Sequence, residues 1–205
     1  LQWLVFSMIS VSFAITGGGI NRLRDALADK NHQLARAVEQ VREMAIRDDL
    51  TGLFNRRHLL EVLERQRALF ARKGLSFAIC YVDLDHFKQI NDRHGHDWGD
   101  RVLRRFSALA LAGMRDGDYF GRLGGEEFLL ILPQSNEQGA LRVAERLRER
   151  WREESFGQEG GPNAVSLSVG VAACQEDETV DELLNRADQG LYRAKSGGRN
   201  QSRVA

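Results

Sequence analysis

The run SFAICYV at residues 76–82 is the feature that most constrains how this chain can fold. Its residues are apolar almost without alternation, which is typical of a central strand that is covered on both faces of a sheet. Helices are expected to supply this cover, because neither face of such a strand can be left to water. The run therefore predicts an α/β protein.

Amphipathic helices and further strands alternate on both sides of this run. The sequence around Gly124 and Gly125 predicts a hairpin within residues 119–132, because glycine tolerates the backbone angles of a tight turn. The remaining expected elements are a strand at 165–173 and helices around 55–72, 101–113, 140–151 and 180–195. Together they predict a central mixed sheet that is surrounded by helices and preceded by a long N-terminal helix.

Residues 1–16 carry no formal charge and lead through the glycines at 17–19 into Arg22, Arg24 and Lys30. The segment approaches the ~20 apolar residues that a spanning helix needs, and the basic residues after it fit a cytoplasmic exit. We therefore expect residues 1–19 to be the end of a transmembrane helix, which holds the protein at the inner (cytoplasmic) membrane with the later residues in the cytoplasm. The alternative is the core of a signal peptide, but no basic segment precedes it. Because the first residue is Leu, we expect a longer chain.

From Ile20 onwards, apolar residues follow a seven-residue spacing that suits a helix pairing with its own copy. One row contains Ile20, Leu27, Leu34 and Val41, and the row beside it contains Leu23, Ala37 and Met44. Lys30 interrupts the second row, so a plain amphipathic connector is the alternative. We expect residues 20–46 to form a helical coiled-coil linker and residues 47–205 to form the main domain.

The charges of the chain balance, with 29 Lys and Arg against 29 Asp and Glu. No overall field therefore attracts the whole molecule to nucleic acid, and we expect no nucleic acid polymer as a partner. Any phosphate-binding site must be local. Cys80 and Cys174 both lie in apolar runs, which predicts buried, reduced thiols.

Two acidic pairs stand at the ends of predicted strands. Asp83 and Asp85 come where SFAICYV ends, and Glu126 and Glu127 lie at the turn of the hairpin. Carboxylates that a strand anchors outside the core can hold a hard cation, and two adjacent glutamates repel each other unless a cation is bound. The alternatives are a helix cap in the first pair and a solvated hairpin tip for the second.

The role of a helix cap falls to Asp85, because Phe87 and Lys88 begin the next helical stretch. The exposed backbone N–H groups of that turn would then face a phosphate, and Lys88 would add positive charge. Asp83 is then either a cation ligand or a surface residue.

Five segments within residues 47–201 point to a function when they are taken in order. They are DDLTGLFNRR (48–57), DLDHFKQINDRHGHDWGD (83–100), GGEEF (124–128), LSVGVA (167–172) and ADQGLYRAKSGGRN (187–200). In order and spacing these segments resemble the GGDEF family of diguanylate cyclases, in its GGEEF variant, and five strings at compatible spacing are very specific. The resemblance implies a nucleotidyl-cyclase fold similar to a polymerase palm, and an enzyme that condenses two GTP into cyclic di-GMP and two pyrophosphates.

The resemblance also implies a metal site. Asp83, the backbone carbonyl of Leu84 and Glu126 would bind a catalytic Mg²⁺ or Mn²⁺, with Glu127 as a further ligand or polar support. Glu126 or Asp83 would assist the departure of the proton from the attacking 3′-hydroxyl. Which glutamate serves as base and which as metal ligand stays open.

The substrate would be read at its base and held at its phosphates. A carboxylate can accept from the N1–H and the exocyclic amine of guanine, whereas adenine offers no such donor pair, which favours GTP over ATP. The residues so implied are Asn91, His96 and Asp100 for guanine, and Lys88, Lys195 and Arg199 for the triphosphate. For Lys195 and Arg199 the alternative is an ordinary basic helix end.

The resemblance implies two further properties. Each domain would hold one GTP, so two domains must face each other in a homodimer, and the helix at 20–46 would control this pairing. Arg115 and Asp118 stand ahead of GGEEF where the family binds cyclic di-GMP as an inhibitor, and Arg146 occupies a plausible third position. We therefore expect product feedback inhibition.

The same residues leave three alternatives open. The domain could be a receptor that binds cyclic di-GMP without turnover, a related cyclase that makes a mixed cyclic dinucleotide, or an idle domain on a membrane-tethered coiled-coil scaffold. Incubation with GTP and Mg²⁺ separates the first from a diguanylate cyclase, and adding ATP beside GTP separates the second. Truncation before Ile46 separates the third, because a cyclase should then lose dimerisation and much activity yet keep GTP binding.

Overall fold

The computed structural model describes most of the chain. The described residues are Arg24, Leu27, 29–34, 36–37, 43–156, 161–162 and 164–205. The chain divides into two compact units, Leu1–Ala45 and Ile46–Ala205. In the first unit every described residue is helical, and Leu27, Leu34 and Met44 are 61%, 63% and 68% exposed. Much of the predicted coiled coil lies outside the described residues.

The expected location at a membrane is corrected by the structure. In the part of the chain that is described, no helix combines the length and the apolar composition that crossing a membrane requires. The helix Arg56–Lys73, for example, carries Glu61, Glu64 and Arg65 along its length, and such charges are costly inside a bilayer. The apolar run on which the expectation rests, within residues 1–19, lies outside the described residues.

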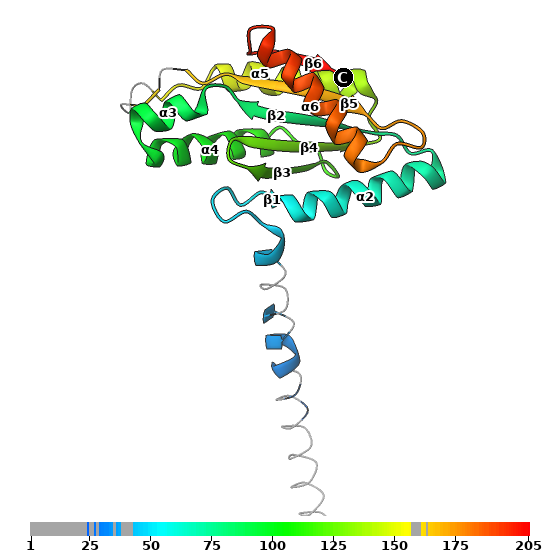
Figure 1. Ribbon diagram of the computed structural model, residues 1–205. Coiled ribbons are helices and arrows are strands. Elements are labelled where there is room, and N and C mark those ends of the chain that lie inside the picture. The colour runs from blue at the N-terminus through cyan, green and yellow to red at the C-terminus, as the bar shows by residue number, and fades with distance from the viewer. Residues whose placement is uncertain are drawn as a thin grey trace, which may run out of the picture. The chain divides into compact units, whose positions relative to one another are not determined.

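A six-stranded mixed sheet forms the centre of the second unit, as predicted (Figure 1). Its strands are β1 (Phe54–Asn55), β2 (Phe77–Leu84), β3 (Tyr119–Gly124), β4 (Glu127–Pro133), β5 (Leu167–Ala173) and β6 (Ser202–Val204). They lie in the order β1-β3-β4-β2-β5-β6. The strand β2 is antiparallel to both of its neighbours, β3 and β4 form an antiparallel hairpin, and the two short edge strands pair in parallel.

Helices cover both faces of this sheet. They are α2 (Arg56–Lys73), α3 (Phe87–His94), α4 (His96–Leu111), α5 (Glu137–Arg152) and α6 (Val180–Ser196). Ala78, Cys80 and Val82 of β2 pack into one apolar cluster with α4 and α5, while Phe77 and Ile79 pack into another with α2 and α6. Because successive side chains of a strand point to opposite faces, this arrangement explains why the sequence of β2 lacks alternation.

The helix predicted at 101–113 begins earlier than expected, and a separate helix precedes it. Helix α3 ends at His94 and α4 begins at His96, with Gly95 between them at a φ of 87°. Glycine permits this sharp change of direction. Helix α2, by contrast, lies within a residue of its predicted range, because the Asn55 side chain accepts a hydrogen bond from the His58 amide at 3.0 Å and caps its start.

Both cysteines are free thiols, as predicted, although Cys174 is only half-buried. Burial raises the pKa of Cys80 to about 12 and the pKa of Cys174 to about 11. Neither side chain is therefore a thiolate at neutral pH, and neither is expected to act as a nucleophile.

Candidate active site

The end of β2 meets the turn between β3 and β4. Asp83 lies opposite Glu127 in the β2–β4 ladder, and the Leu84 amide donates to the Glu126 carbonyl at 3.3 Å. Gly125 has a φ of 52°, which this tight turn requires and which glycine adopts readily. The structure thus brings together the acidic residues that the sequence places at the strand end and at the hairpin turn.

We call Asp83, Glu126 and Glu127 the acidic cluster. Lys195 of α6 forms an ion pair with Asp83, with its Nζ 2.7 Å from Oδ2. Asp83 is 4% exposed. Burial raises the pKa of Asp83 to about 6, with Lys195 opposing this shift and the charges of Glu126 and Glu127 adding to it. The acidic cluster therefore carries more negative charge than its one lysine partner neutralises.

The acidic cluster fits a hard divalent cation. Within the described ranges, no three acidic, His or Cys side chains already stand together at the spacing of a closed metal site. Mg²⁺ needs no closed site, because it keeps several waters and binds through one or two carboxylates together with substrate phosphates. Asp83 and Glu126, with the Leu84 carbonyl, could meet that need. A cation there would also relieve the repulsion that contributes to the raised pKa of Asp83.

The residues predicted to read guanine lie on two helices that pack together, α3 and α4. Gly99 is buried against Asn91, and a Cβ at position 99 would collide with Asn91 Oδ1. That oxygen is buried without a hydrogen-bond partner among the described residues, which is unusual for a polar atom. Asp100 Oδ2 lies 3.5 Å from Arg104 Nη2, with 44% of the Asp100 side chain exposed. His96 is exposed at the first position of α4.

The residues predicted to hold phosphate lie at the start of α3 and at the end of α6. Lys88 is exposed in the first turn of α3. Lys195 belongs to the last turn of α6, where it meets Asp83. Arg199 follows α6, is exposed and has a φ of 62°. The structure therefore brings Lys195 to the acidic cluster and leaves Lys88 and Arg199 accessible to solvent.

Asp85 does not cap α3, contrary to the prediction. His86 occupies the N-cap position with a φ of 60° and makes no side-chain capping bond. The Asp85 carboxylate instead accepts hydrogen bonds from the hydroxyls of Ser166 and Ser168 and from the Asn200 amide. The pattern at 85–88 fits a cap locally, but these donors come from distant segments whose approach the local sequence does not show.

Arg122 of β3 joins the hairpin turn to the start of the second unit, and the sequence analysis missed it. Its Nε and Nη2 donate to the Gly125 carbonyl at 2.9 and 2.8 Å, and its Nη1 lies 3.2 Å from Asp48 Oδ1. That oxygen also accepts from the amide and the hydroxyl of Thr51. Burial would raise the pKa of Asp48, but the bonds from Thr51 and Arg122 outweigh it and lower that pKa. The available signal was the motif DDLTGLFNRR (48–57), which contains the partners Asp48 and Thr51.

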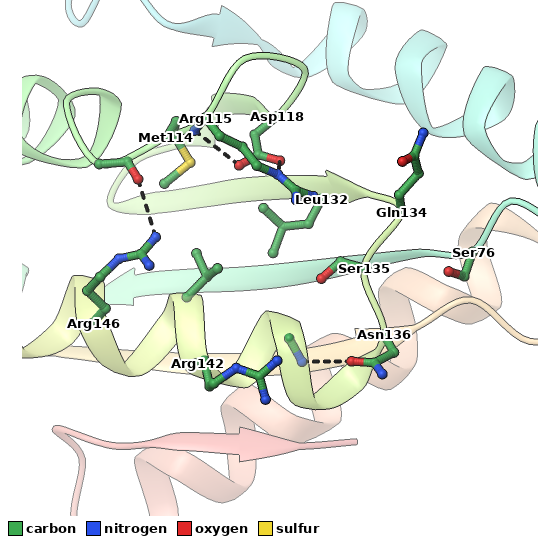
Figure 2. A pocket seen from close by; sticks show the side chains of 13 residues that line it. Ser76, Met114, Arg115, Asp118, Leu132, Gln134, Ser135, Asn136, Arg142 and Arg146 are labelled. Carbon is green, nitrogen blue, oxygen red and sulfur yellow. Dashed lines mark hydrogen bonds and ion pairs between the residues drawn. The ribbon is translucent and has the colours of Figure 1, made fainter.

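A separate pocket of about 650 Å³ lies between α5 and the open end of the β3–β4 hairpin (Figure 2). We call it the arginine pocket, because Arg115, Arg142 and Arg146 line it together with Asp118. Arg115 Nε lies 2.9 Å from Asp118 Oδ1, and Arg115 Nη2 donates to the Pro133 carbonyl at 2.6 Å. The structure thus places all three residues of the predicted inhibitory site around one cavity.

The arginines of this pocket differ in how the sequence could reveal them. Arg146 Nη2 donates to the Gly113 carbonyl at 3.3 Å, and this predicted residue lines the pocket (Figure 2). The sequence analysis missed Arg142, which lines the same wall. Its position four residues before Arg146 was the available signal, because this spacing puts both side chains on one face of a helix.

Comparison with known protein families decides the classification. The family described as "Diguanylate cyclase, GGDEF domain" matches residues 45–201. The chain belongs to this GGDEF family. The match contains the acidic cluster, the residues of α3 and α4 and the arginine pocket.

Individual relatives agree with the GGDEF assignment. The chain is 38% identical to the diguanylate cyclase DgcP of Pseudomonas aeruginosa over 182 residues, which cover 89% of the chain and 26% of DgcP. It is 41% identical to the response regulator PleD of Caulobacter vibrioides over 161 residues, which cover 77% of the chain and 36% of PleD. The chain therefore spans well under half the length of these two relatives.

The GGDEF fold is also found in solved structures. The crystal structure of the coiled coil and GGDEF domain of DgcB from Caulobacter crescentus, in complex with c-di-GMP, is similar with a TM-score of 0.83 and 30% identity. The similarity covers 90% of this chain and 97% of the DgcB chain. The mixed sheet and its surrounding helices are thus those of a GGDEF domain.

Proposed function

We propose that the chain is a diguanylate cyclase that condenses two GTP molecules into cyclic di-GMP and releases two pyrophosphates. The observation that carries this proposal is the acidic cluster at the end of β2, where Asp83 forms an ion pair with Lys195. DgcP, to which 89% of this chain aligns, is named a diguanylate cyclase. In this chain the motif has the form GGEEF, with Glu126 and Glu127 as its acidic pair.

The acidic cluster supplies the metal site in this proposal. Asp83, the Leu84 carbonyl and Glu126 would hold Mg²⁺ or Mn²⁺, with Glu127 as a further ligand or polar support. When bound, such an ion supplies positive charge that stabilises the reacting α-phosphate and favours ionisation of the attacking 3′-hydroxyl. A carboxylate oxygen of Asp83 or Glu126 accepts the hydroxyl proton. With a pKa of about 6, Asp83 is largely deprotonated at neutral pH and can serve in either role.

The guanine base would lie between α3 and α4. Asp100 accepts from the N1–H and the exocyclic amine of guanine, and it is available because 44% of its side chain is exposed. Asn91 adds a second polar contact, and His96 shapes the edge of the site. Adenine presents no matching pair of donors to Asp100, so GTP is preferred over ATP.

The triphosphate would lie across the start of α3 and the end of α6. Lys88, Lys195 and Arg199 bind its oxygens and neutralise the charge that develops on the leaving pyrophosphate. Lys195 is already fixed beside the acidic cluster by its 2.7 Å contact with Asp83. Lys195 therefore stands where it can contact both a phosphate and the carboxylate that holds the metal.

Activity would require a homodimer, because each GGDEF domain (residues 47–205) binds one GTP and two must react with each other. The linker at residues 20–46 would pair with its copy as a coiled coil. Leu27, Leu34 and Met44 belong to its heptad rows and are more than 60% exposed in the single chain, which supports pairing through these side chains. The DgcB structure likewise contains a coiled coil together with its GGDEF domain.

The arginine pocket would bind cyclic di-GMP and provide feedback inhibition. Arg115 and Arg146 offer guanidinium groups to the phosphates and to guanine, and Asp118 can accept from a guanine edge. A volume of about 650 Å³ is in the range of small-molecule sites. DgcB was crystallised with c-di-GMP, which supports the same ligand class here.

Incubation of the purified chain with GTP and Mg²⁺ tests the proposal. The expected products are one cyclic di-GMP for every two pyrophosphates, and ATP in place of GTP should give neither. A chelator should abolish turnover, and Mn²⁺ should restore it. If the chain binds nucleotide and dimerises but releases no pyrophosphate, the cyclase proposal is wrong. Binding of cyclic di-GMP under those conditions would instead identify a receptor.

A further inference from the structure

The carboxylate of Asp85 is a buried charge that uncharged donors surround. Asp85 is 3% exposed. Its Oδ1 accepts from the Ser168 hydroxyl at 2.7 Å, and its Oδ2 accepts from the Ser166 hydroxyl at 2.7 Å and from the Asn200 amide at 3.1 Å. Its own amide donates to the Ser166 carbonyl at 2.8 Å. Burial disfavours a carboxylate, so one that is kept here needs a structural or functional reason.

The segment that follows α6 has a backbone that needs support from outside. Arg199 and Asn200 have φ angles of 62° and 47°, in a region that residues with side chains adopt rarely and at a cost. The Arg199 amide donates to the Ala194 carbonyl at 3.0 Å, and Asn200 Oδ1 accepts from Arg148 Nη1 at 3.2 Å. The hydrogen bond from the backbone N–H of Asn200 to Asp85 ties this segment to the turn between β2 and α3.

We propose that Asp85 is a positioning residue that fixes Arg199 for binding the triphosphate of GTP. The turn that carries Asp85 lies in the chain between Asp83 of the acidic cluster and Lys88 of α3. The bond to Asn200 therefore connects the phosphate contacts of α3 with the segment of Arg199. Arg199 is a long, exposed side chain, and a fixed backbone reduces the freedom that it loses on binding. This inference rests on the proposed role of Arg199 in the GTP site.

The same contacts argue against Asp85 as a further metal ligand. Both of its oxygens already accept hydrogen bonds from the protein, and the two bonds from hydroxyls are well formed, at 2.7 Å. A cation at Oδ2 would have to displace Ser166 or Asn200, because these two donors occupy both lone pairs of that oxygen. Asp85 therefore acts on the site through the segment that it holds.

A double-mutant cycle on the full 205-residue chain tests this role. Binding of a non-hydrolysable GTP analogue with Mg²⁺ is measured for Asp85→Asn, Arg199→Ala and the double variant. Asparagine keeps the shape of Asp85 but removes its charge and offers one acceptor oxygen in place of two, so it weakens these hydrogen bonds without opening a cavity. Each single variant should bind about tenfold more weakly, and the double variant no worse than Arg199→Ala, because Asp85 acts through Arg199.

Hydrogen exchange provides a readout that does not depend on GTP. In Asp85→Asn the backbone amide of Asn200 should exchange at least about tenfold faster, because the bond that protects it is no longer strengthened by a charged acceptor. The amides of β2, which pair with β4 and β5, should keep their protection. Asp181→Asn is the matched control, since Asp181 is an exposed carboxylate in the first turn of α6. It should alter neither exchange nor binding.

Several results would overturn the proposal. Losses that multiply to about a hundredfold in the double variant would mean that Asp85 acts independently of Arg199. Unchanged binding by Asp85→Asn in a folded protein, or by Arg199→Ala, would also contradict it. If Asp85→Asn does not fold, Ser168→Ala replaces it, with an expected loss of about threefold that is seen only when Arg199 is present. Failure of the parent to make cyclic di-GMP would refute the cyclase and leave the result on Asp85 intact.

Discussion

The two ends of the β3–β4 hairpin carry charge of opposite sign. The acidic cluster lies at the turn between the strands, whereas the arginine pocket lies where β3 begins and β4 ends. Each site holds one residue of the opposite charge, which is Lys195 in the acidic cluster and Asp118 in the arginine pocket. The resulting ion pairs are similar in length, at 2.7 Å for Lys195 with Asp83 and 2.9 Å for Arg115 with Asp118.

The two sites differ in which of their charges is buried. In the acidic cluster a residue of the majority charge is buried, and burial raises the pKa of Asp83 to about 6. In the arginine pocket the majority charge is exposed, since the side chain of Arg115 is 60% exposed and that of Asp118 only 4%. The acidic cluster therefore carries an electrostatic cost that a bound cation would relieve. The arginine pocket carries no such cost and is suited to a phosphate.

The length of the hairpin keeps the two sites apart. Strand β3 runs over Tyr119–Gly124, which is about 20 Å of extended chain. A ligand in the arginine pocket therefore does not cover the acidic cluster of the same domain. Product inhibition through this pocket would have to act by restricting how two domains meet, rather than by blocking GTP directly.

Glu126→Gln should have the largest effect, because it removes a charge from the acidic cluster alone. The rate of pyrophosphate release from GTP should fall by about a thousandfold or more, since an amide replaces a carboxylate of the proposed metal site. Calorimetry should find an unchanged affinity for cyclic di-GMP at the other end of the hairpin. Glu149→Gln, whose parent side chain is 66% exposed on α5, is the matched control. Turnover above about a tenth of the parent rate would exclude Glu126 from the metal site.

Arg115→Ala should weaken anion binding in the arginine pocket and leave the acidic cluster unchanged. Affinity for cyclic di-GMP should fall by about 30-fold or more, because the guanidinium offers paired donors to phosphate and guanine. Progress curves of the parent should flatten as product accumulates, whereas those of the variant should stay closer to linear. Arg72→Ala is the control, since Arg72 is exposed and donates to the Ala68 carbonyl of its own helix. Equal flattening in all three proteins would contradict an inhibitory role for the pocket.

The sequence predicts the framework of both sites, because short-range patterns determine it. The apolar run before Asp83 predicts β2, and the glycines before Glu126 predict the hairpin turn. Pairing of β2 with β4 then brings the two together. Arg115 and Asp118 stand three residues apart, so their ion pair is local as well. The strand, the turn and this ion pair each require only local knowledge, whereas the pairing of β2 with β4 joins residues 44 positions apart, Asp83 and Glu127.

What the sequence does not predict depends on contacts between distant segments. The donors to Asp85 lie 81 to 115 residues away, although its neighbours look like the start of a helix. Arg122 meets Asp48 across 74 residues. Helix α4 begins directly after Gly95, at His96, which is five residues before the predicted start at 101. The edge strands β1 and β6 are only 2 and 3 residues long, which is too short for alternation to reveal them.

Asp83→Asn should show how much the buried carboxylate of Asp83 costs the acidic cluster in stability. Folding raises the pKa of Asp83 from 3.8 to about 6, so its contribution to stability is fully present below the lower value and is lost as pH rises through the higher one. Near neutral pH and without metal, the Asn variant should therefore be more stable than the parent, with a free energy of unfolding about 1–2 kcal/mol higher. At acid pH the difference should vanish. Chemical denaturation at each pH measures it.

The parent and Asp83→Asn also test whether Mg²⁺ binds at the acidic cluster. Mg²⁺ should raise the midpoint of thermal unfolding of the parent, more above the pKa of Asp83 than below it, because a metal binds the deprotonated carboxylate. It should not raise that of the Asn variant. Lys195 loses its partner in this variant, but its side chain is 35% exposed and can return to water. A variant that is less stable than the parent near neutral pH would mean that the ion pair outweighs the cost of burial.

Arg122→Lys should have the smallest effect, and it tests whether the acidic cluster needs its turn to be held. Arg122 contacts both Asp48 and the Gly125 carbonyl, whereas a lysine ammonium lacks the planar fork that reaches both. We expect kcat to fall about fivefold at unchanged GTP affinity, and the free energy of unfolding to fall by about 1 kcal/mol. Steady-state kinetics and denaturation measure the two effects.

The arginine pocket provides the internal control for this variant, because it lies at the other end of the hairpin. Its affinity for cyclic di-GMP should not change in Arg122→Lys. Asp48→Asn completes a double-mutant cycle, and the two substitutions should be less than additive, since Arg122 bonds to Asp48 directly. Additive losses would mean that Arg122 holds the turn without help from Asp48. A parallel loss of cyclic di-GMP affinity would mean that the hairpin shifts as one body, and the two ends could then not be treated as independent sites.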